Sequence, residues 1–156
     1  MPATQLAELD ALRDSLLGSA DRLLASIDGL TAAQLNWTPP AENANSIYAI
    51  VSHALSAQEG LILHRVFGQE QDPASRGGWG ASGDSIEPLQ ARWRALRARL
   101  DAALTNASRE DLERACEHPR LGTFSGWGML LLVNRHTAEH VGHVELTRDL
   151  AWAAGV

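Results

Sequence analysis

Apolar side chains recur three or four residues apart through four long segments, and this spacing limits what the chain can fold into. It places the apolar groups of each segment on one stripe of an α-helix. The predicted helices cover about residues 4–28, Asn45 or Ser46 to Val66, Asp84 to Leu104, and Thr123 or Ser125 to about Ala153. Each helix can bury its stripe only against the others. We therefore predict an all-α fold, an antiparallel four-helix bundle, with a globin-like packing as the alternative.

The connections between these helices are predicted from residues that stop helices. Asp28-Gly29 ends the first helix, and residues 37–40 (Trp-Thr-Pro-Pro) cannot continue one because proline lacks the N–H donor. Residues 68–83 hold one proline and several glycines, which favours irregular backbone. We expect this segment to be a loop that could form a flap over a site.

Short polar motifs predict where the later helices begin. Asp84, followed three residues later by Glu87, resembles a capping box for the third helix. Residues 108–111 (Ser-Arg-Glu-Asp) resemble a short capped turn. Residues 118–122 are expected to be a connector into the last helix.

Length and charge narrow the classes of protein. The 156 residues contain no biased tract or repeat, so we expect one domain spanning residues 1–156. The net charge of −6 disfavours binding to nucleic acid. The dense basic run is interpreted as the solvated face of a helix rather than a nucleic-acid patch; it consists of Arg92, Arg94, Arg97 and Arg99.

The expected compartment is the cytoplasm, with no membrane partner. No segment offers the roughly 18 uninterrupted apolar residues of a membrane span, and we find no signal peptide. The single cysteine, Cys116, cannot form an internal disulfide, which suits a reducing compartment. We do not interpret Cys116 as a nucleophile, because Glu113 and Glu117 beside it would disfavour the thiolate.

The last predicted helix carries histidines on its apolar stripe. Four residues apart, His136 and His140 lie on one face, about one turn or ~6 Å apart along the axis. His143, Thr147 and Leu150 continue the predicted inward stripe. An unpartnered buried imidazole costs on the order of 1–3 kcal/mol, so the fold must either pair these rings or bind something with them.

A third histidine, His53, lies near the middle of the second predicted helix and could face His136 and His140 across the bundle. Three neutral imidazoles would hold one cation and leave its fourth position open, as in catalytic zinc sites. Imidazole suits Zn²⁺, Ni²⁺ and similar ions. Hydrogen-bonded structural histidines are the alternative, and the spacing alone leaves both interpretations open.

The remaining candidates have weaker patterns. Eleven residues beyond His53, His64 is about three turns or ~16 Å away, so we interpret it as a surface or rim residue, with a substrate contact as the alternative. We expect His118 in a solvent-facing loop. Trp93 is predicted to be core, whereas Trp37 and Trp79 are candidate walls of a substrate cleft. Two carboxylates could orient imidazoles, although exposed helix faces are the preferred interpretation; they are Glu59 and Glu139.

Several motifs resemble those of the DinB/YfiT-like superfamily of metalloenzymes. Residues 135–150 (Arg-His-Thr-Ala-Glu-His-Val-Gly-His-Val-Glu-Leu-Thr-Arg-Asp-Leu) resemble its C-terminal signature. Its Trp-x-Pro loop, Asn-Ser-Ile helix start and His-Leu element are matched in order by Leu35-Asn36-Trp37-Thr38-Pro39, Asn45-Ser46-Ile47 and His53-Ala54-Leu55. The resemblance spans about residues 30–150. Ala54, and His143 where many relatives carry glutamine, depart from the pattern.

The resemblance implies an up-down-down-up bundle with a divalent metal, Zn²⁺ or Ni²⁺, held by His53, His136 and His140. His143 would then contact the metal, its water or a substrate. The superfamily contains bacillithiol S-transferases and mycothiol-dependent maleylpyruvate isomerases, which implies a small electrophilic substrate and a low-molecular-weight thiol cosubstrate. The alternative is a non-catalytic module that binds a metal or ligand, such as a stress-response homodimer.

Overall fold

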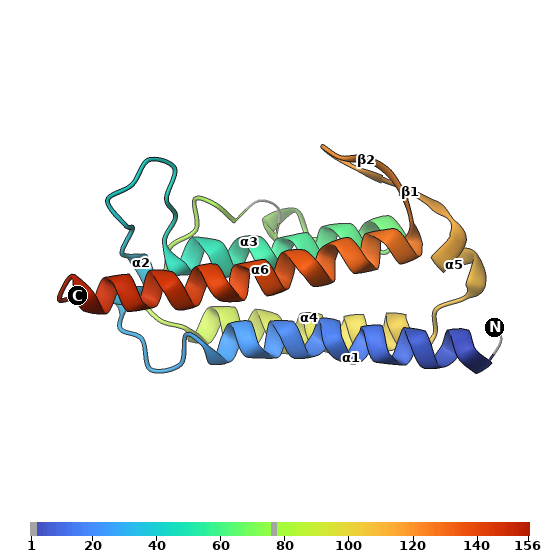
Figure 1. The fold of residues 1–156 in the computed structure, drawn as a ribbon, viewed down its shortest axis with the longest axis horizontal. Helices are drawn as coiled ribbons and strands as arrows, with labels where there is room; N and C mark the ends of the chain where they lie inside the picture. The colour runs from blue at the N-terminus through green and yellow to red at the C-terminus, as the bar shows by residue number, and fades with distance from the viewer. Residues whose placement is uncertain (1–2, 76–77) are drawn as a thin grey trace.

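The computed structural model describes residues 3–75 and 78–156. Within this part of the chain, four long helical segments lie side by side along the molecule (Figure 1). These are α1 (Ala3–Ala25), α3 (Ile47–Ala57) with its continuation η1 (Gln58–Val66), α4 (Glu87–Thr105) and α6 (Gly126–Ala153). The short elements are α2 (Ala32–Asn36), η2 (Pro73–Ser75), α5 (Arg109–Glu113), β1 (Ala115–His118) and β2 (Gly122–Ser125). The predicted all-α bundle is confirmed.

The directions of the helices explain the longest connection. Figure 1 shows α1 and α6 running one way, and α3 and α4 running the other way, which is the up-down-down-up order. Because α3 and α4 are parallel, the chain must return along the bundle between them. The described parts of that return segment, residues 67–75 and 78–86, pass the middle of α3, where Gly78 lies against the backbone of His53.

Leucine-rich stripes from all four helices meet in the core. Packing of α1 on α4 and α6, and of α3 on α6, buries these side chains completely. Each such burial contributes roughly 1.5–3 kcal/mol. Trp93 is buried as predicted, and its indole Nε1–H donates to Asp21 at 2.8 Å. Fully buried examples are Leu16, Leu23, Leu55, Leu100 and Val133.

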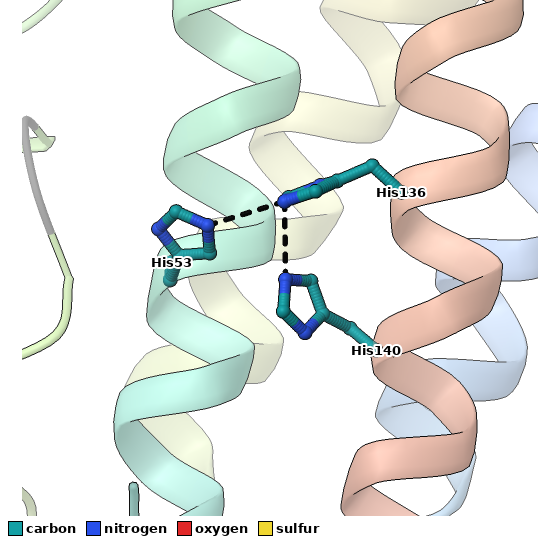
Figure 2. Close-up of side chains that lie close together, drawn as sticks. All are labelled: His53, His136 and His140. Atoms are coloured by element: carbon teal, nitrogen blue, oxygen red, sulfur yellow. Dashed lines mark hydrogen bonds between the residues drawn. The ribbon is translucent and has the colours of Figure 1, made fainter. Parts of the chain in front are cut away.

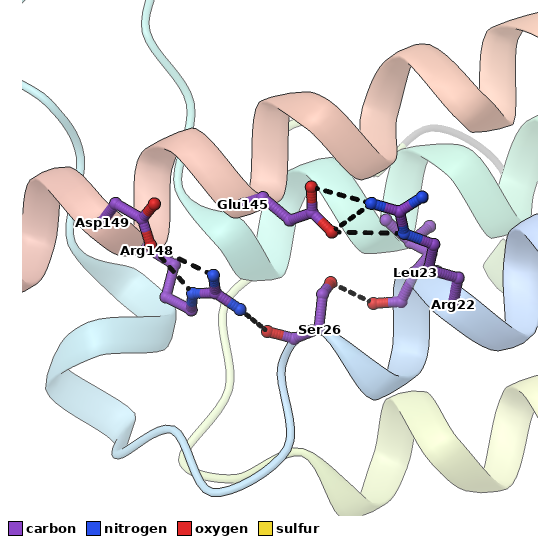
Figure 3. A network of polar contacts seen from close by, with 6 residues as sticks. All are labelled: Arg22, Leu23, Ser26, Glu145, Arg148 and Asp149. Carbon is purple, nitrogen blue, oxygen red and sulfur yellow. Dashed lines mark hydrogen bonds and ion pairs between the residues drawn. The ribbon is translucent and has the colours of Figure 1, made fainter.

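Polar contacts add to the apolar packing where the C-terminal end of α1 lies against α6 (Figure 3). Arg22 Nη2 is 2.8 Å from Glu145 Oε1. Arg148 Nη1 donates to the carbonyl oxygen of Ser26 at 3.4 Å and pairs with Asp149 on its own helix. The Ser26 hydroxyl in turn donates to the carbonyl of Leu23. These contacts are mostly exposed, so they contribute little to the free energy of unfolding. We attribute to them mainly the alignment of α1 along α6.

The helix caps match the sequence in three places and differ in one. Ser108 and Asp111 form a capping box at the start of α5, in agreement with the capped turn predicted at residues 108–111. The hydroxyls of Ser46 and Ser125 accept backbone N–H groups at the starts of α3 and α6. Each is one of the two cap residues that the sequence offered, the others being Asn45 and Thr123. The predicted capping box of Asp84 and Glu87 is wrong, because α4 begins at Glu87 without a side-chain cap. Pro88 occupies the first turn, where proline is favoured, and this moves the start of the helix.

Two further elements depart from the predicted bundle. The second helix changes to π geometry over η1, which turns both Gln58 and Glu59 into the interior. The predicted connector at 118–122 is the turn of an antiparallel hairpin, in which Ala115 pairs with Ser125. Its strands have four residues each, too few to show an alternating pattern. Within residues 3–75 and 78–156, no helix is both long enough and apolar enough to cross a lipid bilayer.

Candidate metal centre

Three imidazole rings converge where α3 lies against α6 (Figure 2). His53 projects from the middle of α3, and His136 and His140 project from successive turns of α6. The Nε2 atom of His136 is 3.2 Å from Nε2 of His53 and 3.1 Å from Nε2 of His140. One nitrogen from each ring lies within 4.8 Å of the others. The structure thus brings together the three residues that the sequence selected.

The inward stripe of α6 differs from the predicted one at its C-terminal end. His140 is only 6 % exposed and Thr147 is buried, but His143 and Leu150 face solvent. A helix has 3.6 residues per turn, so a strict three-and-four pattern drifts around the axis. Val144 and Ala151 continue the buried stripe in their place. The prediction that His143 points inward is therefore wrong.

The donor set fits a divalent cation. Tetrahedral Zn²⁺ with Zn–N bonds of ~2.0–2.1 Å separates its ligand nitrogens by about 3.3 Å, close to the two short distances above. Without a cation, the Nε2 of His136 could donate its single proton well to only one of its two neighbours. At the second contact, the Nε2 atoms of the two rings would then face each other without a good hydrogen bond. A shared cation satisfies all three.

Burial keeps these imidazoles neutral, which is the form that binds metals. Burial first, then the charges of His136 and Arg120, lowers the pKa of His53 to about 4. Burial and the neighbouring histidines lower the pKa of His140 to about 3. Burial also lowers the pKa of His136. Near neutral pH the nitrogen lone pairs are therefore available.

His143 contacts the far side of one candidate ligand rather than the cluster itself. Its Nδ1 is 3.3 Å from Nδ1 of His140. A proton on His140 Nδ1 can be donated to His143, and this tautomer leaves His140 Nε2 free to bind a cation. On His136, the corresponding Nδ1 is buried without a hydrogen-bond partner in the described structure.

The crossing loop places an aromatic ring over the cluster. The indole of Trp79 stacks on His53, with ring centroids 3.9 Å apart and planes 21° apart. Gly78 permits this approach, because its φ is +125° and a Cβ there would lie 2.5 Å from the backbone nitrogen of His53. Trp37, the other candidate wall, follows α2 and does not line the cavity that opens beside the histidines.

A cavity of about 740 Å³ opens beside the histidines. His53, His136 and Trp79 line one part of it, and His64 lies on its wall as a rim residue. Three arginines also line it, together with one carboxylate; they are Arg65, Arg120, Arg135 and Glu139. Sequence reasoning missed Arg65 and Arg120, since nothing in their local pattern distinguishes them from solvated arginines.

Hairpin residues shape the same cavity. His118 is half-buried at the end of β1 rather than in a solvent-facing loop, and its Nδ1 accepts the backbone N–H groups of Arg120 and Leu121 at 3.1 Å. These bonds fix the turn of the hairpin, whose residues line the cavity. Cys116 is buried within β1, and its thiol donates to the carbonyl of Arg114 at 3.5 Å, which agrees with a structural role.

The two candidate carboxylates have different surroundings. Glu139 is exposed and pairs with Arg135 at 3.3 Å. Glu59 is only 4 % exposed and is 2.8 Å from Arg99 and 3.6 Å from Arg92, so the expected exposed position is wrong. Burial would raise the pKa of Glu59, but a hydrogen bond from Ser75 and the two arginines lower it overall. Arg92 and Arg99 are therefore partners of Glu59 and not part of a solvated face.

Comparison with known proteins agrees with this fold. A family model described as the DinB superfamily matches residues 15–144. Among solved structures, a conserved protein from Enterococcus faecalis is similar, with a TM-score of 0.70 and 15 % sequence identity. The match covers 96 % of this chain and 97 % of the other. The search of curated proteins finds no match.

Proposed function

The chain belongs to the DinB superfamily, and we propose that it is a metal-dependent enzyme whose His53, His136 and His140 hold one divalent cation. The reaction is transfer of a thiol sulfur, or of a water oxygen, to the electrophilic carbon of a small molecule. The leaving group departs with the electron pair of the broken bond. The observation that carries this proposal is the convergence of three neutral Nε2 atoms beside a cavity.

The chemistry of an open imidazole site supports the proposal. A divalent cation with three imidazole ligands lowers the pKa of a thiol or water at its remaining position, which yields a nucleophile near neutral pH. The protein supplies the orientation of the ligands: α3 and α6 fix the rings, and His143 Nδ1 lies where it can accept a proton from His140 Nδ1. Imidazole donors favour Zn²⁺ or Ni²⁺ as the ion.

The cavity provides room for a small substrate. Its volume of about 740 Å³ lies within the range of small-molecule sites. Leu61, Leu132 and Val133 give it apolar walls, and Trp79 covers part of the histidine cluster. These walls can contact the apolar part of a small substrate.

Metal uptake is the first test. Protein purified without added metal, then titrated with Zn²⁺ or Ni²⁺, is expected to bind one equivalent, measured by elemental analysis. His140→Ala is expected to lose uptake. The matched control is His64→Ala, because His64 contacts the Gln69 carbonyl rather than the cluster. Less than about a tenth of an equivalent in the unmodified protein would contradict the proposal.

Turnover is the second test, and it separates the enzyme from a non-catalytic module with the same metal site. Metal-loaded protein is incubated with panels of low-molecular-weight thiols and electrophiles, and products are identified by mass spectrometry. Metal-dependent product formation that His140→Ala abolishes supports the enzyme. Stoichiometric metal uptake without any product supports the binding module.

A further inference from the structure

Two arginines without carboxylate partners lie on the wall of the cavity beside the histidine cluster. Arg65 comes from the last turn of η1, and Arg120 comes from the tip of the hairpin between β1 and β2. The two are 55 positions apart in the sequence, so the tertiary fold alone brings them to one cavity. Both side chains belong to exposed residues and are accessible from solvent.

Among the described residues, Arg65, Arg94, Arg114 and Arg120 have no carboxylate within 4.0 Å, and of these only Arg65 and Arg120 line the cavity. The net charge of the chain is −6, and most arginines of the described residues pair with a carboxylate within 4.0 Å. Arg135, the third arginine of the cavity, pairs with Glu139. In residues 3–75 and 78–156, neither Arg65 nor Arg120 has such a pair. The cavity wall thus carries two uncompensated positive charges on an acidic protein.

The two charges act on the same region. The pKa of His118 is lowered by burial first, and then by the charges of Arg120 and Arg65. Arg120 also contributes to the lowered pKa of His53, at the other part of the wall. The electrostatic effect of the two arginines therefore reaches both the hairpin and the histidine cluster.

We propose that Arg65 and Arg120 bind an oxyanion, a carboxylate or phosphate, on the small molecule that reacts at the histidine cluster. Guanidinium groups present planar pairs of N–H donors that match these oxygens. The other end of the same molecule, a thiol or an electrophilic carbon, reaches His53 and His136 across the cavity. This inference rests on the proposed function and adds the substrate class: an anionic small molecule.

The first test compares two thiols that differ only in charge. The full-length protein is loaded with Co²⁺, whose visible absorption changes when sulfur binds, and is titrated with 3-mercaptopropionate and with its neutral amide. The acid is expected to bind about tenfold more tightly than the amide in the unmodified protein. In Arg65→Gln/Arg120→Gln this preference should fall to about one. Arg94→Gln, an exposed arginine of α4 away from the cavity, should keep it.

The second test needs no metal. Trp79 lines the same cavity. The difference in fluorescence between the unmodified protein and Trp79→Phe is the emission of Trp79, and its quenching by a charged quencher depends on the electrostatic potential in the cavity. Iodide should quench this component more strongly than the neutral quencher acrylamide, relative to free tryptophan. The double arginine substitution should lower iodide quenching about twofold and leave acrylamide quenching unchanged. Equal iodide quenching in both proteins would overturn the inference.

The outcomes separate this inference from the proposed function. Failure to bind Co²⁺ would contradict the metal site, while the iodide measurement would still decide whether the cavity attracts anions. Equal affinity for acid and amide, with normal metal uptake, would overturn only the anion inference. Competition by acetate and by inorganic phosphate identifies which oxyanion is preferred. If neither anion displaces 3-mercaptopropionate, the anion inference is overturned.

Discussion

At the scale of single residues, the position of His143 decides how firmly His140 is oriented. His143 does not reach the converging Nε2 atoms, since its contact is the 3.3 Å approach of its Nδ1 to Nδ1 of His140. A hydrogen bond on the far nitrogen of a metal-binding imidazole fixes the tautomer and the ring orientation. We therefore interpret His143 as a positioning residue.

Substitution of His143 tests this role. His143→Ala is expected to weaken Zn²⁺ binding by about 10–100-fold, since loss of such a partner typically has this effect. His143→Gln should recover most of the affinity, because an amide oxygen can accept the proton from His140 Nδ1. Competition with a chromophoric chelator measures both. Unchanged affinity in His143→Ala would contradict the positioning role.

At the scale of elements, the crossing segment between η1 and α4 is held in place from α4. Arg99 donates to the carbonyl of Glu70 at 3.3 Å, and Arg92 donates to the carbonyl of Ser75 at 3.1 Å. Both guanidinium groups also contact the buried carboxylate of Glu59 on η1. One buried charge thereby ties η1, α4 and the segment that carries Trp79.

The loop's approach to α3 depends on Gly78. Gly78→Ala should displace the segment, because the added Cβ would meet the His53 backbone at 2.5 Å and the residue would keep an unfavourable φ of +125°. Trp79 should then leave His53, and its emission should shift to the red. Gly80→Ala is the matched control, because open space surrounds a Cβ at Gly80. Identical emission spectra of the two variants would contradict this account.

The buried carboxylate is expected to matter for stability. Glu59→Gln should lower the free energy of unfolding by about 1–3 kcal/mol, because it leaves Arg92 and Arg99 without their charged partner. Glu113→Gln should cost less than about 1 kcal/mol, since its pair with Arg109 is exposed. Urea unfolding followed by circular dichroism measures both. An equal effect of the two substitutions would show that burial does not strengthen the Glu59 pair.

At the scale of the whole molecule, histidine burial makes the metal-free fold sensitive to acid. The pKa values of His53 and His140 are about 4 and about 3 in the folded chain, against about 6.5 when unfolded. Between these values the unfolded chain binds more protons, so stability falls as pH decreases below about 6.5. Above about 6.5 both states are neutral and these groups contribute no pH dependence.

Melting temperatures of the metal-free protein, measured with chelator between pH 7.5 and 4.5, test this sign. The melting temperature should decline from about pH 6.5 downward, at pH values above those at which carboxylates such as Glu59, whose pKa is lowered in the folded chain, take up protons. His53→Gln/His140→Gln should flatten the curve in this window, since the substituted side chains do not titrate. A curve equally steep in both proteins would contradict the explanation.

The sequence by itself determined the helices and the residues that could form a site. Apolar spacing is a local property with the period of the helix, so it predicted α1, α3, α4 and α6. Polar side chains before the second and fourth helices narrowed their caps to two residues each, among them Ser46 and Ser125. The same period put His136 and His140 on one face. The position of His53 in the middle of the second predicted helix made it a candidate partner, and the resemblance to the superfamily implied the same three residues.

Tertiary structure alone decided what surrounds those histidines. Four features depend on how distant segments pack: the exposure of His143, the hairpin, the stacking of Trp79 on His53, and the presence of Arg65 and Arg120 on one cavity wall. The local sequence patterns do not predict these features. A contact between two elements depends on how the elements are oriented and how far apart they lie, and the spacing of residues along one helix does not specify either. Charge compensation likewise becomes visible only when Glu59 is found buried beside Arg99.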